Sequence, residues 1–507
     1  MQATGLAAVW KTLGWDPVAT DVHVTGVTSD SRQVVAGDLF IACVGDPQRL
    51  QSFVAQAQAK QAAAVAIDDT QLQLLEASNF TVPIIPVTQL AQQQGKLAAQ
   101  ILAQPSAKLN LMGITGTNGK TSISHYLAQA HNNMGFTCGV IGTTGNGLLN
   151  NLQAGPNTTP DAVSVQNLLA QMLDQDAQAC AMEVSSHGLD QHRVNGCEFD
   201  IAVLSNLSRD HLDYHGTMQA YAQAKAKLFS WPGLRHAIIN IDDKFGQALI
   251  DEIASDVRLW TYSTRSQAGQ VAISVAEVNY TRQGLEAVIN TPLGSLELAT
   301  SLYGEFNLSN LLACLGVLLA KGYSLATIQP ALKTLTPVAG RMEKYLGGSG
   351  LTVIVDYAHT PDALRAALQA TRQHLDSGQL WCVFGCGGDR DQGKRPLMAK
   401  IAEHWADSIV VTDDNPRYED ATVITQQIQA GFTDHGKVEV INNRKQALEF
   451  ALQHAKPKDI VLVAGKGHEV YQEIAGQRHH FSDRAVVATK CRHWPGHRGR
   501  SPAICVP

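Results

Sequence analysis

The sequence predicts an α/β protein of three domains, and two features of the chain carry this prediction. The first is an apolar run at residues 109–114 that ends in a glycine-rich loop and continues into a helical pattern. The second is the recurrence of short apolar runs separated by helical stretches, which is typical of mostly parallel sheets covered by helices on both faces. A chain of 507 residues is long enough for three domains of ordinary size.

The first expected domain spans residues 1–105. Short strands alternate with helical stretches here, including a strand at 38–42 and a helix at about 52–61. Prolines at 83, 86 and 105 precede the glycine-rich loop, so we place the domain boundary near residue 105. The polar cluster at 28–32 is typical of a turn when it is considered alone.

The second expected domain spans residues 106–337 and contains a central P-loop-type sheet. Its predicted strands lie at 139–141, 179–184, 201–204 and 237–241, with an antiparallel section at 260–300 and a buried helix at 307–320. Because the carboxyl ends of parallel strands face the ligand crevice, polar residues that follow these strands are candidate site residues.

The glycine-rich loop of this domain has the pattern of a phosphate-binding loop. Gly116 and Gly119 let backbone N–H groups turn toward an anion, and the following helix directs its positive end to the same place. Lys120 would reach the β- and γ-phosphates of a nucleotide, and the Thr121 hydroxyl would bind Mg²⁺. The strict pattern has glycine at the position of Ile114, so this loop is a variant of it. A glycine-rich turn that binds nothing is the alternative, but the lysine and threonine at a helix start favour nucleotide binding.

The third expected domain spans residues 338–490 and repeats the alternation of strands and helices. Its predicted strands lie at 352–355, 380–384, 408–412, 438–441 and 459–463. This order is typical of a doubly wound, Rossmann-like sheet. Residues 491–507 contain no acidic residue and several Arg, His, Gly and Pro, so we expect a disordered tail.

Composition excludes several classes of protein. The formal net charge of -6 argues against a general affinity for nucleic acid or acidic membranes. The nine cysteines are scattered and do not form paired zinc-ligand spacings, so reduced thiols are expected. The longest apolar run, 311–320, is about half the length that crosses a bilayer. We therefore expect a cytoplasmic protein.

Two further stretches place polar side chains after predicted strands of the central domain. Glu183 ends one strand and is followed by serines and a histidine; from its residues alone this stretch is equally a Mg²⁺ ligand set or a loop with a buried glutamate. Residues 206–216 carry many side chains that can bind metal, among them His211.

Taken together, these motifs resemble those of the Mur ligases. The matching stretches, in chain order, are the glycine-rich loop, Glu183-Val184-Ser185-Ser186, residues 206–216, Asp356-Tyr357-Ala358-His359-Thr360-Pro361, Gly388-Asp389-Arg390, Asp414-Asn415-Pro416-Arg417 and Gly465-Lys466-Gly467-His468-Glu469. The resemblance covers about residues 20–488.

The resemblance implies a cytoplasmic, ATP-dependent ligase of peptidoglycan synthesis that forms an amide bond through an acyl phosphate. Within the family, the chain is similar to the members that add meso-diaminopimelate to the D-glutamate of UDP-N-acetylmuramoyl-L-alanyl-D-glutamate. It also implies Mg²⁺ as cofactor, ATP as substrate and a monomer that binds neither nucleic acid nor membrane. Domains 1–105, 106–337 and 338–490 would bind the UDP-substrate, ATP and the amino acid.

The resemblance also implies the site residues. The catalytic residues would be Lys120, Glu183, His211 and Lys225. The ATP-binding residues would be Gly116, Thr117, Asn118, Gly119, Lys120, Thr121, Ser122, Asn307, Arg341, Asp356 and His359. The UDP-substrate would contact Ser29, Ser31, Thr158, Thr159, Ser185, Gln191 and Arg193. The amino acid would contact Arg390, Asp414, Asn415, Arg417, Gly465 and Glu469. The Mg²⁺ ligands would be Thr121, Glu183, His211 and Lys225, with Lys225 carbamylated to N6-carboxylysine.

The sequence departs from the family pattern at residues 46–50, where a loop that helps to hold uridine is expected. Two alternative functions remain open at this point. One is a sister ligase, such as a lysine-adding enzyme or a folylpolyglutamate synthase, and the motif at 414–417 distinguishes it. The other is a P-loop switch that binds ATP without ligation, against which Glu183, His211 and Lys225 argue.

Overall fold

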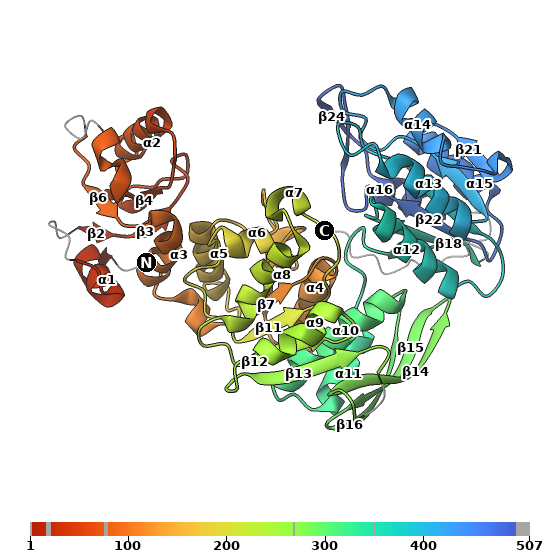
Figure 1. Ribbon diagram of the computed structural model, residues 1–507, viewed down its shortest axis with the longest axis horizontal. Helices are drawn as coiled ribbons and strands as arrows, with labels where there is room; N and C mark the ends of the chain where they lie inside the picture. The colour runs from red at the N-terminus through yellow and green to blue at the C-terminus, as the bar shows by residue number, and fades with distance from the viewer. Residues whose placement is uncertain (1–2, 17–21, 76–79, 267–268, 348–349, 493–507) are drawn as a thin grey trace. The chain divides into compact units, whose positions relative to one another are not determined.

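The computed structural model describes residues 3–16, 22–75, 80–266, 269–347 and 350–492 (Figure 1). Contacts divide the chain into two compact units. Unit 1 comprises residues 1–262 and 313–323, and unit 2 comprises residues 263–312 and 324–507. Each unit contains parallel strands with helices packed on them, which confirms the predicted α/β class.

Unit 1 begins with a 4-stranded parallel sheet of order β3-β4-β5-β6. Its elements are β3 (Gly26–Thr28), β4 (Asp38–Ala42), β5 (Ala64–Asp68), β6 (Ile84–Val87), α1 (Leu6–Leu13), α2 (Pro47–Ala59) and α3 (Leu90–Ile101), next to an antiparallel ribbon of β1 (Thr4–Gly5) and β2 (His23–Val24). Alternate residues of β4 serve opposite faces: Leu39 and Ile41 pack in the cluster that contains α1 and α3, and Phe40 packs in the cluster that contains α2.

Helix α2 begins at Pro47, earlier than the start predicted near residue 52. Asp46 caps it by accepting a hydrogen bond from the Gln48 N–H at 2.9 Å, and Pro47 occupies the first turn, where its missing N–H costs nothing. The stretch 46–50, which departs from the family pattern, is therefore a capped helix start.

The larger sheet of unit 1 has the strand order β13-β12-β11-β7-β10-β8-β9. Its strands are β7 (Asn110–Thr115), β8 (Cys138–Gly142), β9 (Gly145–Leu148), β10 (Ala179–Glu183), β11 (Ile201–Leu204), β12 (His236–Asn240) and β13 (Arg258–Ser263). Its helices include α4 (Lys120–Asn133), α5 (Ala162–Leu173), α6 (Ser186–Asp190), α7 (Leu212–His215), α8 (Met218–Ala226) and α9 (Lys244–Leu249). All its pairings are parallel except β8 with β9, so β7, β10 and β11 end at one edge.

The two sheets of unit 1 are joined by close contacts. A Cβ on Gly95 of α3 would lie 1.9 Å from the Asn195 carbonyl oxygen, so only glycine allows this approach. The Ser29 hydroxyl donates to Asp161 Oδ1 at 3.0 Å, and the Asn167 amide donates to the Val27 carbonyl at 2.9 Å. The turn that carries Ser29 is therefore tied to α5.

Unit 2 combines an antiparallel meander with a 6-stranded sheet of order β17-β18-β22-β19-β20-β21. The meander consists of β14 (Ile273–Thr281), β15 (Gly284–Thr291) and β16 (Gly294–Thr300). It is followed by α10 (Glu305–Ala320), of which residues 313–320 group with unit 1, and by α11 (Leu325–Lys333). The sheet contains β17 (Glu343–Leu346), β18 (Thr352–Asp356), β19 (Leu380–Phe384), β20 (Ser408–Val411), β21 (Val438–Val440) and β22 (Ile460–Ala464). Its remaining elements are α12 (Pro361–Gln373), α13 (Lys394–Trp405), α14 (Ala421–Gln429), α15 (Arg444–His454), α16 (Asp483–Arg492) and a hairpin of β23 (Tyr471–Ile474) and β24 (Gln477–His480).

The predicted antiparallel section at 260–300 is therefore correct for β14 to β16, whereas β13 pairs in parallel with β12. The boundaries at residues 105 and 337 stay predictions. Residues 263–312, assigned from the sequence to the domain 106–337, group by contacts with unit 2.

His374 explains part of that grouping. Its ring is buried and stacks on Tyr303 at a centroid distance of 3.8 Å and an interplanar angle of 8°. Nε2 accepts a hydrogen bond from the Gly304 N–H at 2.9 Å, and Nδ1 donates to the Thr281 carbonyl at 2.6 Å. These two bonds fix one neutral tautomer, and burial lowers the pKa of His374 from 6.5 to about 4.

We expect acid to destabilise unit 2 through His374. The pKa of His374 is lower in the folded state than in the unfolded state. Its contribution to the free energy of unfolding is therefore present above pH 6.5 and is lost as the pH falls toward 4. Between pH 7.5 and pH 5 the loss should be about 1 to 2 kcal/mol. Urea unfolding of the His374→Gln variant at the two pH values should show a smaller difference than the wild type. An equal difference would contradict the assignment.

Helix α16 corrects the expected start of the tail. The helix continues to Arg492, and Cys491 is 5% exposed in the cluster that contains Val487 and Leu448. The predicted disorder of 491–507 is therefore wrong for its first two residues, because Cys491 completes an apolar helix face. Residues 493–507 lie outside the described residues. Among the described helices, none has both the length and the apolar character needed to cross a membrane.

Candidate active site

The glycine-rich loop connects β7 to α4, as predicted. Gly116 has φ +144°, and a Cβ there would lie 1.9 Å from Ser205 Oγ; Gly119 has φ +89° and precedes the first turn of α4. Glycine is therefore required for this loop path. The Lys120 ammonium donates to the carbonyls of Gly116 and Thr117 at 2.8 and 2.9 Å. The Asn118 N–H donates to Asn206 Oδ1 at 3.0 Å, and Ser122 is buried in the first turn of α4.

Glu183, at the end of β10, connects this loop to the next strand. The Thr121 hydroxyl donates to Glu183 Oε2 at 3.0 Å, and the Thr143 N–H donates to Glu183 Oε1 at 2.9 Å. The Thr143 hydroxyl lies 3.2 Å from Glu183 Oε2 and 3.0 Å from the Thr158 hydroxyl. Glu183 is 1% exposed. Carboxylate and hydroxyl oxygens are the donors that Mg²⁺ prefers, so Thr121 and Glu183 fit the ion chemically.

The residues expected at the UDP-substrate lie beside Glu183. The Thr159 hydroxyl donates to the Glu183 carbonyl at 2.8 Å and accepts from the Ser185 N–H at 3.0 Å. Arg193 donates to the Thr159 carbonyl at 2.8 Å and to Gln191 Oε1 at 2.6 Å. Thr159 is fully buried, and both its hydroxyl and its carbonyl hold the loop structure.

Ser29 and Ser31 lie on the turn after β3. Ser29 is bonded to Asp161 as described, and the Ser31 hydroxyl donates to Gln56 Oε1 of α2 at 2.9 Å. Both hydroxyls thus join the turn to neighbouring helices.

Lys225 is 1% exposed, although lysine is rarely buried. Its amine donates to the Gly116 carbonyl at 2.9 Å and lies 4.4 Å from the centroid of the Tyr221 ring. Burial lowers the pKa of Lys225 to about 6, and the positive charge of Lys120 adds to this effect. The neutral amine therefore predominates at neutral pH, beside the phosphate loop.

His211 lies in the same neighbourhood. Its ring centroid is 5.9 Å from that of Tyr221 and 4.9 Å from that of His187, and its Nε2 is 3.5 Å from Asp210 Oδ2. In the part of the chain that the structure describes, no three His, Cys, Asp or Glu side chains are arranged to hold a metal ion. A metal site here would therefore need hydroxyl groups or a modified Lys225 as additional ligands.

In unit 2, the residues expected at the nucleotide gather around the end of β18. Asp356 accepts hydrogen bonds from the N–H groups of Met342 and Ala358 at 2.7 and 2.9 Å. The Arg341 guanidinium lies 4.6 Å from the centroid of the Tyr357 ring. Among the described residues, Arg341 Nε is a buried donor without a hydrogen-bond partner, which suits the binding of an anion.

His359 also follows β18, whereas Asn307 lies on a different element, α10. His359 Nδ1 donates to the Tyr357 carbonyl at 2.9 Å, and burial lowers the pKa of His359. Asn307 is buried in the first turn of α10, where its amide donates to the Tyr303 carbonyl at 2.9 Å. This bond corresponds to a structural role within the helix start.

The residues expected at the amino acid lie on three loops that follow β19, β20 and β22. Arg417, with φ +53°, donates to the Gly388 carbonyl at 2.7 Å, and the exposed Arg390 donates to the Asp389 carbonyl at 3.4 Å. Asn415 donates to Glu469 Oε2 at 3.0 Å, which joins the loop after β20 to the loop after β22.

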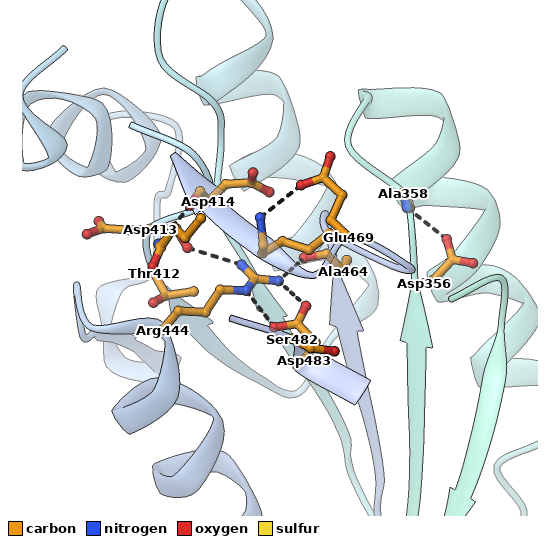
Figure 2. A network of polar contacts seen from close by, with 12 residues as sticks. Asp356, Ala358, Thr412, Asp413, Asp414, Arg444, Ala464, Glu469, Ser482 and Asp483 are labelled. Atoms are coloured by element: carbon orange, nitrogen blue, oxygen red, sulfur yellow. Dashed lines mark hydrogen bonds and ion pairs between the residues drawn. The ribbon is translucent and has the colours of Figure 1, made fainter. Parts of the chain in front are cut away.

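Lys466 was not predicted as a site residue, although it lies within the motif at residues 465–469. Its side chain is fully buried and donates to Asn415 Oδ1 at 3.0 Å and Glu469 Oε2 at 2.9 Å. Figure 2 shows Glu469 to the right of Asp414, with the guanidinium of Arg444 below both. The two glycines that flank Lys466 could have indicated its burial, because glycine is common where two backbones approach closely.

Comparisons with known proteins agree with this arrangement. Residues 114–318 match the Mur ligase middle domain, and residues 340–467 match the Mur ligase glutamate ligase domain. UDP-N-acetylmuramoyl-L-alanyl-D-glutamate–2,6-diaminopimelate ligase from Pseudomonas aeruginosa is 49% identical over 93% of this chain and 97% of its own length.

Two solved structures are also similar. A structure of a UDP-N-acetylmuramoyl-L-alanyl-D-glutamate–2,6-diaminopimelate ligase aligns with a TM-score of 0.73 and 37% identity, over 97% of this chain and 99% of that one. The MurF ligase from Thermotoga maritima in complex with ADP aligns with a TM-score of 0.64 and 17% identity, over 88% and 94% of the chains. The latter similarity concerns the fold alone.

Proposed function

This chain belongs to the Mur ligase family, and on that premise we propose that it is an ATP-dependent ligase of peptidoglycan synthesis. It adds meso-diaminopimelate to the D-glutamate of UDP-N-acetylmuramoyl-L-alanyl-D-glutamate and releases ADP and phosphate. We place it in the cytoplasm as a monomer.

The hydrogen-bonded series of Thr121, Glu183, Thr143 and Thr158 carries this proposal. It begins at the phosphate loop and ends at residues expected to hold the UDP-substrate, and each link is 3.2 Å or shorter. A phosphoryl donor and a carboxylate acceptor bound at its two ends would be neighbours. Proximity of this kind supplies much of the rate acceleration in group transfer.

The chemistry follows from that proximity. The D-glutamate γ-carboxylate oxygen attacks the terminal phosphorus of ATP, and ADP leaves. The amine of meso-diaminopimelate then adds to the acyl carbon, loses a proton, and expels phosphate as the amide forms. Lys120 neutralises negative charge on the transferred phosphoryl group. Both steps concentrate anionic charge, which cationic groups must stabilise.

Mg²⁺ supplies further charge neutralisation when it is bound. Thr121 and Glu183 would hold it at the phosphate loop, with His211 and a carbamylated Lys225 as additional ligands. The burial and neutral amine of Lys225 support the carbamate, because only a neutral amine adds to CO₂, and the product is an anion.

The amino-acid specificity depends on the distal carboxylate of meso-diaminopimelate, which lysine lacks. Arg417 and Arg390 can each grip a carboxylate through two parallel N–H groups, while Asp414, Asn415, Gly465 and Glu469 offer partners for the other polar groups. When lysine binds in such a site, the positive charge of the arginine that pairs with the distal carboxylate has no partner. Discrimination against lysine should therefore be on the order of a thousandfold.

We expect Arg417→Lys and Arg417→Ala to lower kcat/KM for meso-diaminopimelate by about a hundredfold without restoring efficient use of lysine. A lysine at this position keeps the charge but not the two parallel donors. Steady-state kinetics with both amino acids measures the effect, and Arg478→Lys, on the exposed hairpin strand β24, is the matched control. If Arg417→Ala had wild-type kinetics, Arg417 would not belong to the amino-acid site.

A phosphate-release assay separates this proposal from an ATP switch. Release should require both UDP-N-acetylmuramoyl-L-alanyl-D-glutamate and meso-diaminopimelate. Equal release from ATP alone would favour the switch, and release dependent on a folate and glutamate would favour a folylpolyglutamate synthase.

A further inference from the structure

The proposed amino-acid site combines two loops whose strands are not neighbours in the sheet. Asp414, Asn415 and Arg417 follow β20, and Gly465 and Glu469 follow β22. In the sheet order β18-β22-β19-β20, strand β19 separates these two strands, so no backbone ladder joins them. Backbone hydrogen bonds of Arg417 with Glu473 and Ala475 join the loop after β20 to the hairpin that follows the loop after β22. Nearer the sheet, the distance between Asp413 and Ala464 is bridged by a side chain.

Arg444, the first residue of α15, spans that distance. Its Nη1 donates to the Asp413 carbonyl at 3.2 Å, at the start of the loop after β20. Its Nη2 donates to the Ala464 carbonyl at 2.9 Å, at the end of β22. Figure 2 shows the guanidinium between these carbonyls, with Asp483 on its other side.

Asp483 fixes the orientation of the guanidinium. Its two carboxylate oxygens accept from Arg444 Nε and Nη2 at 2.8 and 2.7 Å, and both side chains are fully buried. Such a bidentate pair holds the planar fork in one orientation. The remaining donors are then directed at the two loop carbonyls.

The loops meet directly above this pair. A Cβ on Gly465, which has φ +117°, would lie 2.5 Å from Asp414 Oδ2 and 3.7 Å from Arg444 Nη2. The buried Lys466 then bonds to Asn415 and Glu469 together. A shift of either loop would therefore displace proposed amino-acid ligands on both.

We propose that Arg444, oriented by Asp483, is a positioning residue that sets the spacing of the amino-acid site and thereby its preference for the longer, dicarboxylic substrate. This inference rests on the proposed function. Arg444 acts through the backbone of the two loops and does not touch the substrate. Neither residue lies in one of the motifs that this chain shares with the Mur ligases.

The test compares Arg444→Lys and Asp483→Asn with the wild type. Lysine keeps the positive charge, but its single ammonium cannot bond to both carbonyls and the carboxylate as the planar guanidinium does. Each variant should raise KM for meso-diaminopimelate by about tenfold or more and lower the preference over lysine, because small displacements of binding groups are costly. KM for ATP and for the UDP-substrate should stay within about twofold of the wild type.

Arg372→Lys is the matched control. Arg372 also joins a carboxylate, Asp407 Oδ2 at 2.9 Å, and a backbone carbonyl, that of Trp405, but at the amino ends of β19 and β20. It should leave KM for meso-diaminopimelate unchanged.

The outcomes distinguish this inference from the proposed function. If the wild type ligates no diamino acid, the proposed function fails. If the wild type ligates meso-diaminopimelate but folded Arg444→Lys and Asp483→Asn keep its KM, the positioning role alone is overturned. If one variant fails to fold, the other decides. If neither folds, or if only the active fraction falls while KM is unchanged, the pair serves stability and the inference is likewise overturned.

Discussion

Replacing Lys120 by alanine is expected to lower kcat for ligation by about a thousandfold or more. Lys120 is the first residue of α4, and its side chain donates to carbonyls of the preceding loop, where a bound phosphate would compete for its ammonium. Lys120 is partly exposed, so the melting temperature should change little. Product formation measured with all three substrates, together with a thermal melt, gives both quantities.

Lys108→Ala is the matched control for this change. Lys108 is exposed and lies before β7, at the opposite end of the same strand. It should leave both activity and melting temperature unaltered. Near-normal turnover in Lys120→Ala would contradict the assignment of the phosphate loop.

Lys225→Ala should be nearly inactive, with a loss on the order of a thousandfold, because the proposed carbamate is an anionic ligand beside the phosphate loop. A small carboxylate such as acetate should restore part of the activity, since it can supply the missing oxygens. In ¹³C-bicarbonate, the wild type should give a carbamate carbonyl resonance that Lys225→Ala lacks.

Lys227→Ala is the control for Lys225. It lies two positions along the chain, is about half exposed and forms a surface ion pair with Asp190 at 3.0 Å. Its loss should leave the carbamate resonance and the activity in place. A wild-type protein that gives no such resonance with bicarbonate and Mg²⁺ present would contradict the carbamate.

Local patterns predicted the elements around the site well. The strands at 201–204 and 380–384 match β11 and β19, because short apolar runs bounded by polar residues leave little freedom for their ends. The change from strand to helix at residues 115–120 was likewise evident from the glycines. Boundaries that depend on caps, such as the start of α2 at Pro47, were less accurate.

The residues that sequence reasoning missed depend on contacts that are distant in the chain. Arg444 has no motif around it, and its role follows from a sheet order that places β19 between β20 and β22. Lys466 was visible in a motif, but its burial against Asn415 and Glu469 was not. Thr159 was predicted as a site residue, but the sequence did not show that its hydroxyl serves the loop after β10.

The most direct test of the proposed ligase is the identity of its product. Purified wild-type protein is incubated with ATP, Mg²⁺ and UDP-N-acetylmuramoyl-L-alanyl-D-glutamate, together with equal concentrations of meso-diaminopimelate and L-lysine, and the nucleotide products are resolved by mass spectrometry. We predict the diaminopimelate-containing UDP-tripeptide almost exclusively, with one ADP formed for each tripeptide. Equal amounts of the lysine-containing product, or ADP formation without any tripeptide, would contradict the proposal.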